Sequence, residues 1–92
     1  MDLQEKRPEI LRIATLHGAR NVRLFGSIAR GDDSPGSDID LLVEMESGRS
    51  LLDLVGLGQD LERLLNRRVD VVTDGSVHPA LRARILAEAR PL

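Results

Sequence analysis

One stretch of the sequence constrains both fold and chemistry: residues 26–43 read GSIARGDDSPGSDIDLLV. Its second half is an aliphatic run typical of a buried strand, yet Asp38 and Asp40 lie at the start of that run. On a strand, residues i and i+2 point to the same face, so these carboxylates project side by side with Cβ atoms about 7 Å apart. Such a pair repels itself unless a cation lies between, and its oxygens suit Mg²⁺ bound jointly with phosphate. The stretch therefore predicts a cation site at the start of a strand.

A third aspartate repeats this pattern further along the chain. Asp70 lies in the alternating, valine-rich segment 68–73 (RVDVVT), which is typical of a strand. If this strand neighbours the one that Asp38 and Asp40 open, the three acids converge. Three carboxylates are the protein's share of a two-metal phosphoryl-transfer site, in which metals about 3.5–4 Å apart hold the attacking and leaving oxygens. Asp38, Asp40 and Asp70 are therefore candidate metal ligands and catalytic residues.

The turn at Gly26 and Ser27 follows directly on a predicted strand over residues 21–25. Glycine lets the backbone approach a phosphate closely, and Ser27 opens a short helical turn whose N–H groups point at an anion. We expect the metals to hold one side of a triphosphate and this turn to hold the other.

The remaining pattern predicts helices around these strands. Apolar spacing favours a helix over 8–17, with Pro8 in its first turn and His17 at its end. Residues 32–37 have turn chemistry, and Ser50 and Asp53 form a capping box for a leucine-rich helix that runs to about Asn66.

A last helix is expected over about 79–89, with Leu81, Ile85 and Leu86 facing inward. The order is helix, strand, short helical turn, strand, helix, strand, helix. We expect one α/β (α+β) domain over residues 1–92, with a small mixed β-sheet covered by helices.

Composition excludes several classes of function. The 13 basic residues include one lysine, Lys6, and the arginines are spread along a chain of net charge −2, so no nucleic-acid-binding stripe is indicated. Phe25 is the one aromatic residue, which leaves no set of rings for stacking bases. There is no cysteine and no apolar run of about 18 residues, so we expect a cytoplasmic protein without disulfides or membrane spans.

The motifs carry a resemblance that covers essentially the whole chain. Gly26-Ser27 with Ala29-Arg30-Gly31, then the segments 37–43 (SDIDLLV) and 69–72 (VDVV), resemble the nucleotidyltransferase superfamily of DNA polymerase beta type. With the tail over 78–89, the chain looks like the minimal nucleotidyltransferases (MNT) that pair with HEPN-domain proteins. The resemblance implies the nucleotidyltransferase fold.

The resemblance also implies roles for individual residues. Asp38 and Asp40 would bind two Mg²⁺ ions, and Asp70 would complete the site and assist deprotonation of the attacking hydroxyl. Gly26 and Ser27 would bind the triphosphate of ATP. Arg30 matches a family position near the phosphates.

Three functions remain open at this point. By resemblance, the first is transfer of AMP from ATP to a hydroxyl, a tyrosine in some members, of a partner HEPN toxin, which makes the protein an antitoxin. The second is neutralisation of the HEPN partner by binding alone, for which exposed Leu52 and Val55 are candidate interface residues. The third is nucleotidyl transfer to a small molecule, as in aminoglycoside nucleotidyltransferases.

Overall fold

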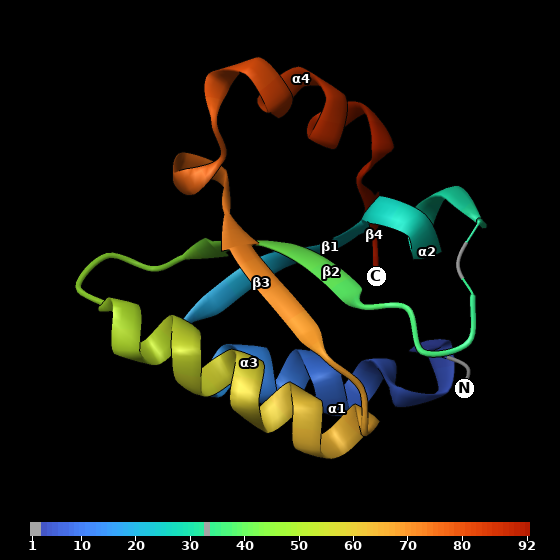
Figure 1. Cartoon of the computed structure of the whole chain (residues 1–92). Helices are drawn as coiled ribbons and strands as arrows, with labels where there is room; N and C mark the ends of the chain where they lie inside the picture. Colours follow the sequence, from blue (N-terminus) through green and yellow to red (C-terminus); the bar gives the residue numbers. More distant parts are fainter. Residues whose placement is uncertain (1–2, 33) are drawn as a thin grey trace.

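The computed structural model describes residues 3–32 and 34–92 (Figure 1). Within these ranges the chain forms a four-stranded sheet with helices on both sides of it. The elements are α1 (Leu3–Leu16), β1 (Ala19–Phe25), α2 (Gly26–Arg30), β2 (Ile39–Met45), α3 (Leu51–Leu65), β3 (Val69–Thr73), the 3₁₀ turn η1 (Asp74–Ser76), α4 (Pro79–Glu88) and β4 (Arg90–Pro91).

The sheet is mixed, with strand order β3-β2-β1-β4. β1 pairs antiparallel with β2 and with β4, whereas β2 and β3 are parallel. A parallel pair needs a crossover connection, and α3 provides it between β2 and β3. The predicted α/β class and the mixed sheet are therefore confirmed, although the short strand β4 was not foreseen.

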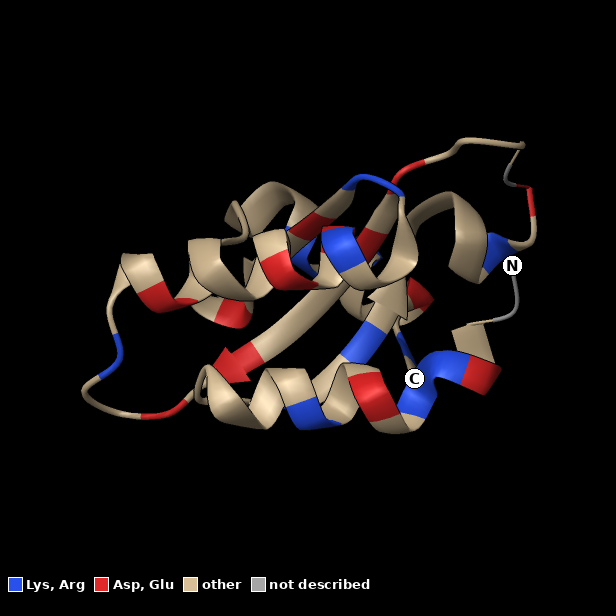
Figure 2. Cartoon of the chain, turned by 90° about the horizontal axis from the view of Figure 1, so that it is seen from below, with Lys and Arg blue, Asp and Glu red and all other residues tan. Residues whose placement is uncertain are grey.

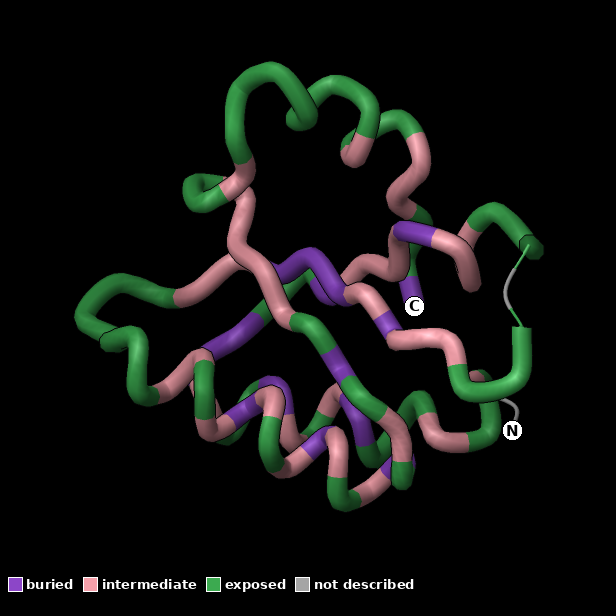
Figure 3. Tube along the Cα trace, viewed as in Figure 1, coloured by how far each residue is buried: buried purple, intermediate pink, exposed green. Residues whose placement is uncertain are grey.

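The main core lies between one face of the sheet and helices α1 and α3 (Figures 1 and 3). Alternate residues of β2 enter this core: Ile39, Leu41 and Val43 are completely or almost completely buried. They pack with the apolar faces of α1 and α3, whose buried residues are Ile10, Ala14, Leu57, Leu61 and Leu65. The intervening residues of β2, Asp40, Leu42 and Glu44, therefore belong to the opposite face, and Asp38 directly precedes the strand.

Helix α4 lies over that opposite face and stands away from the sheet (Figure 1). None of its residues is buried, and it is exposed along most of its length (Figure 3). The prediction that Leu81 and Leu86 face inward is wrong, since they are 51% and 42% exposed. Helical spacing reports that apolar residues share a side of a helix, but not whether anything covers that side.

The first helix begins five residues earlier than expected, at Leu3, so Pro8 lies inside α1 and not in its first turn. The preceding residues Leu3–Arg7 include good helix formers, and their propensity outweighs the backbone hydrogen bond that proline cannot make.

The bounds of the later helices α3 and α4 agree with those predicted from the sequence. Ser50 N–H donates to Oδ2 of Asp53 at 2.9 Å at the start of α3. Among the described residues, no helix has the length and apolar character needed to cross a membrane.

Candidate active site

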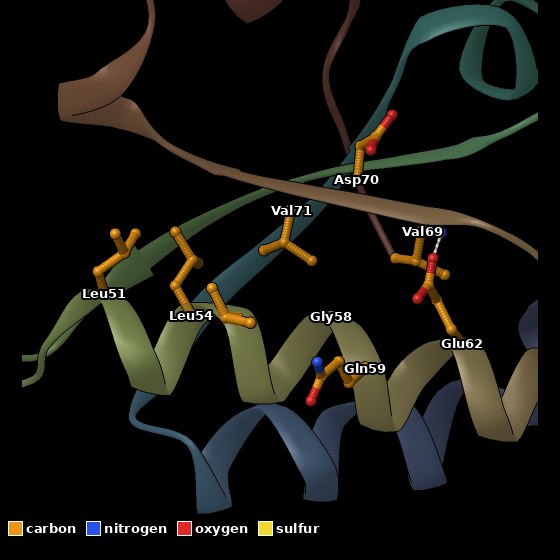
Figure 4. A pocket seen from close by; sticks show the side chains of 9 residues that line it. Leu51, Leu54, Gly58, Gln59, Glu62, Val69, Asp70 and Val71 are labelled. Atoms are coloured by element: carbon orange, nitrogen blue, oxygen red, sulfur yellow. Dashed lines mark hydrogen bonds between the residues drawn. The ribbon is translucent and has the colours of Figure 1, made fainter.

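Three aspartates share the sheet face that α1 and α3 leave uncovered. In the parallel register of β2 and β3, Asp40 lies directly opposite Asp70. Asp38 directly precedes β2, two residues before Asp40, and its negative charge helps to raise the pKa of Asp40. Figure 4 shows Asp70 directed away from α3, whereas Val69 and Val71 point toward that helix. The structure thus places Asp40 beside Asp70, thirty residues apart in sequence, with Asp38 near enough for its charge to affect Asp40.

The local electrostatics favour a bound cation. Burial, and then the like charges of Asp70 and Asp38, raise the pKa of Asp40 above its usual range, while the positive charge of Arg30 opposes this. A carboxylate in such surroundings is stabilised in its charged form by a nearby positive ion. A cation bound here would therefore offset the repulsion between Asp40 and its two acidic neighbours.

The glycine of the Gly-Ser turn lies against Asp40. Gly26 is buried and has φ +76, a left-handed conformation that side chains rarely adopt. A Cβ at this position would collide with Oδ2 of Asp40 and lie 3.0 Å from its Cγ. The predicted phosphate-binding turn and the predicted metal ligand are therefore neighbours, and only glycine permits that approach.

Ser27 and Arg30 both belong to α2, which follows β1 without an intervening loop. Nε of Arg30 donates to Oδ2 of Asp32 and Nη1 donates to Oε2 of Glu88, both at 3.2 Å. Arg30 therefore lies within electrostatic range of Asp40 but is held by two acidic side chains. The predicted role of Arg30 near the phosphates stays a prediction.

The donor set fits Mg²⁺ in an open site. Within residues 3–32 and 34–92, no group of three or more His, Asp or Glu side chains, Asp38, Asp40 and Asp70 included, is arranged so that it could hold a metal ion by itself. Mg²⁺ usually keeps several waters and binds one or two carboxylates together with substrate phosphates. Hard carboxylate oxygens on one side and the Gly26-Ser27 turn on the other suit a metal that arrives with a nucleotide.

Two residues near the site were missed by sequence reasoning. Glu88 of α4 bonds Arg30, and Arg67 bonds the backbone carbonyl of Ser37, just before Asp38. Glu88 and Arg30 are separated by 58 positions in the sequence, and Arg67 and Ser37 by 30 positions. Glu88 lies in the tail over 78–89, but no local pattern assigns a role to it or to Arg67, because each role depends on a partner far away in the sequence.

The groove beside α3 is not part of this site. It has a volume of about 350 Å³ and runs between α3 and β3, lined by residues such as Leu54, Gly58 and Val71 (Figure 4). Although Asp70 borders the groove, its side chain points to the other face of the sheet.

The two histidines have local partners and do not contact the three aspartates. Nε2 of His17 lies 2.7 Å from Oδ2 of Asp60, and Nδ1 of His78 accepts from Ala80 N–H.

A mixed sheet with a Gly-Ser turn against a row of aspartates has the features of a nucleotidyltransferase. A family model described as a nucleotidyltransferase domain matches residues 9–92. The chain belongs to this family, and the protein is a nucleotidyltransferase.

Relatives refine the comparison. A Methanocaldococcus jannaschii protein assigned as a protein adenylyltransferase is 47% identical over 89 residues, which cover 97% of this chain and 96% of that protein. The protein adenylyltransferase MntA of Thermococcus cleftensis is 38% identical over 88 residues, covering 87% of this chain and 89% of MntA. The predicted resemblance to minimal nucleotidyltransferases is confirmed.

Solved structures agree on the fold. A structure described as a minimal nucleotidyltransferase matches with a TM-score of 0.89 at 47% identity, covering 100% of this chain and 97% of that one. A toxin–antitoxin structure with AMP-PNP matches with a TM-score of 0.78 at 23% identity, covering 91% of this chain and 69% of that one.

Proposed function

We propose that the protein is a Mg²⁺-dependent protein adenylyltransferase that transfers AMP from ATP to a tyrosine hydroxyl of a HEPN-domain toxin and thereby acts as its antitoxin. The observation that carries the proposal is the pairing of Asp40 with Asp70 beside Asp38, with Gly26 in contact with Asp40. Relatives of similar length are named protein adenylyltransferases, which supports a protein as the acceptor. Structural neighbours include an MNT antitoxin in complex with a tri-AMPylated Shewanella oneidensis HEPN toxin, which supports the partner class.

The reaction follows from the proposed roles. The acceptor oxygen attacks the α-phosphorus of ATP, a new P–O bond forms, the bond from that phosphorus to the bridging β-phosphate oxygen breaks, and pyrophosphate leaves. Asp70 accepts the hydroxyl proton, directly or through water, as an exposed carboxylate on the open face. The Gly26-Ser27 turn and Arg30 bind the departing phosphates.

Asp38 and Asp40 hold Mg²⁺, which when bound supplies positive charge to the phosphates in the transition state. The face that carries these aspartates is turned away from α1 and α3, and α4, which lies over that face, stands away from the sheet (Figure 1). A large acceptor such as a folded protein can therefore approach it.

The test is the intact mass of a co-expressed HEPN protein. With wild-type chain, the HEPN protein should gain one or more adenylyl groups. With Asp38→Asn and Asp40→Asn combined, which keep side-chain shape but remove the metal-binding charge, transfer should fall by orders of magnitude. Glu5→Gln combined with Glu9→Gln is a matched control, because it removes two charges from exposed positions of α1 and should leave transfer unchanged.

Calorimetry tests the metal separately. ATP should bind with Mg²⁺ and lose most of its affinity in EDTA, and equal affinity in both would contradict the metal role. If the Asn variant still protects cells while the HEPN protein stays unmodified, neutralisation by binding is the correct function. If ATP is consumed and no protein gains mass, the acceptor is a small molecule.

A further inference from the structure

Glu88 of α4 lies between two arginines. Its Oε2 accepts from Nη1 of Arg30 at 3.2 Å, and its Oε1 accepts from Nε of Arg84 at 3.4 Å. The Glu88 side chain is only 18% exposed, whereas Arg30 and Arg84 are 40% and 72% exposed. A carboxylate on an otherwise exposed helix is thus largely withdrawn from solvent by its two cationic partners.

The same residues line a hollow of about 180 Å³ between α2 and α4. Gly26, the glycine in contact with Asp40, is one of its lining residues. The others are Phe25, Arg30, Leu81, Arg84, Ile85 and Glu88. The hollow therefore adjoins the predicted phosphate-binding turn and combines apolar walls with two guanidinium groups.

We propose that this hollow receives the β- and γ-phosphates of the nucleotide, with Arg84 as a second phosphate-binding arginine beside Arg30, and that Glu88 occupies both arginines until the nucleotide displaces it. The inference rests on the proposed nucleotide chemistry and adds α4 to the nucleotide site.

Charge and geometry support this direction of binding. The reacting α-phosphorus has to lie at the aspartates, so the rest of the triphosphate continues past Gly26 on one side. Guanidinium groups bind phosphate as well as carboxylate oxygens in a bidentate manner, and a triphosphate brings more negative charge to the two arginines than the single carboxylate of Glu88. Apolar walls such as Phe25 and Leu81 lower the local dielectric constant and strengthen each of these contacts.

The arrangement also explains why α4 is retained without a buried side chain. Its contacts with the rest of the protein include those with α2, to which the bonds of Glu88 connect it. Because no residue of α4 is buried, its charged side chains can exchange one anion for another without disrupting the core. If the Glu88 contacts only hold α4 in place, removing them should weaken phosphate binding. If Glu88 competes with phosphate, removing its charge should strengthen that binding.

Calorimetry on the isolated full chain in 0.15 M salt tests the proposal, with Mg·AMP-PNP, inorganic triphosphate and AMP as probes. Arg84→Gln should weaken Mg·AMP-PNP and triphosphate about tenfold, the size of one charge-assisted hydrogen bond, and leave AMP unchanged. Arg82→Gln is the matched control, because Arg82 is an exposed arginine of the same helix that does not line the hollow. It should change none of the three affinities.

The direction in which Glu88→Gln changes phosphate affinity decides between these explanations. It should raise the affinity for Mg·AMP-PNP and triphosphate several-fold, because a competing anion is removed, whereas Glu9→Gln on α1 should not. Thermal melts should be used to check that each variant is folded.

Unchanged phosphate affinity in Arg84→Gln, or weaker binding in Glu88→Gln, would overturn the proposal. An equal loss for AMP would assign the hollow to the nucleoside instead. These measurements involve no acceptor, so they stand if the acceptor proves not to be a HEPN protein, and adenylyl transfer can persist if they fail.

Discussion

Alanine at Gly26 tests whether the close approach of the turn to Asp40 matters for chemistry. Gly26 has φ +76, and a Cβ there would collide with Oδ2 of Asp40. To regain ordinary van der Waals separation, the carboxylate has to move by about 1 Å, and a displacement of that size can cost about 10²-fold in rate. We therefore expect Gly26→Ala to lose about 10²-fold or more in adenylyl transfer, together with Mg²⁺-dependent ATP binding.

Gly31 provides a matched control at the other end of α2. It has φ +80, nearly the same backbone conformation, but a Cβ there would meet no atom within 4 Å. An alanine in this conformation costs about 1–2 kcal/mol, which in a domain of this size lowers Tm by between about 4 and 16 °C. Both variants should show this loss of stability, but only Gly26→Ala should lose function.

The assays are thermal melts, calorimetry with Mg·ATP, and transfer to the co-expressed HEPN protein. The difference between the two variants isolates the contact with Asp40 from backbone strain. If Gly26→Ala binds Mg·ATP and transfers AMP as well as Gly31→Ala does, the contact has no catalytic importance and the reasoning is refuted.

Three further predictions concern stability and association. Folding raises the pKa of Asp40, so the folded state holds the proton of this carboxyl group more tightly than the unfolded state does. Without metal, Tm should therefore fall as pH rises from the unfolded-state pKa of Asp40 through its folded-state pKa. Asp40→Asn should flatten this pH dependence of Tm. Added Mg²⁺ should raise the Tm of the wild-type chain at neutral pH and leave it unchanged at a pH where Asp40 is protonated. If the Tm of Asp40→Asn depends on pH and Mg²⁺ as the wild-type Tm does, the prediction is wrong. Leu57→Ala should cost about 3–5 kcal/mol in denaturant unfolding, because Leu57 is completely buried, whereas Leu52→Ala, at an 80% exposed position, should cost less than about 0.5 kcal/mol. Leu52→Ala combined with Val55→Ala should weaken co-elution with the HEPN partner while leaving Mg·ATP binding intact; unchanged co-elution would place the interface elsewhere.

Local features were predictable because they depend on neighbours in sequence. The alternation of strand residues places Asp38 and Asp40 on one side whatever the rest of the chain does. Gly26 follows a strand and opens a helical turn, and the capping box at Ser50 and Asp53 starts α3, as the sequence indicated. These features depend on backbone geometry over two to four residues, which the amino-acid types themselves largely specify.

The arrangement of the site required the tertiary structure. That Asp70 lies opposite Asp40 depends on α3 crossing over so that β3 pairs in parallel with β2, and a shift of one residue would turn Asp70 to the other face. The bond from Glu88 to Arg30 joins residues 58 positions apart, and the exposure of Leu81 and Leu86 depends on α4 standing away from the sheet. A sequence specifies which residues can share a side of an element, but long-range packing decides what that side meets, because the free energy of burial comes from contacts between elements and not from any one of them.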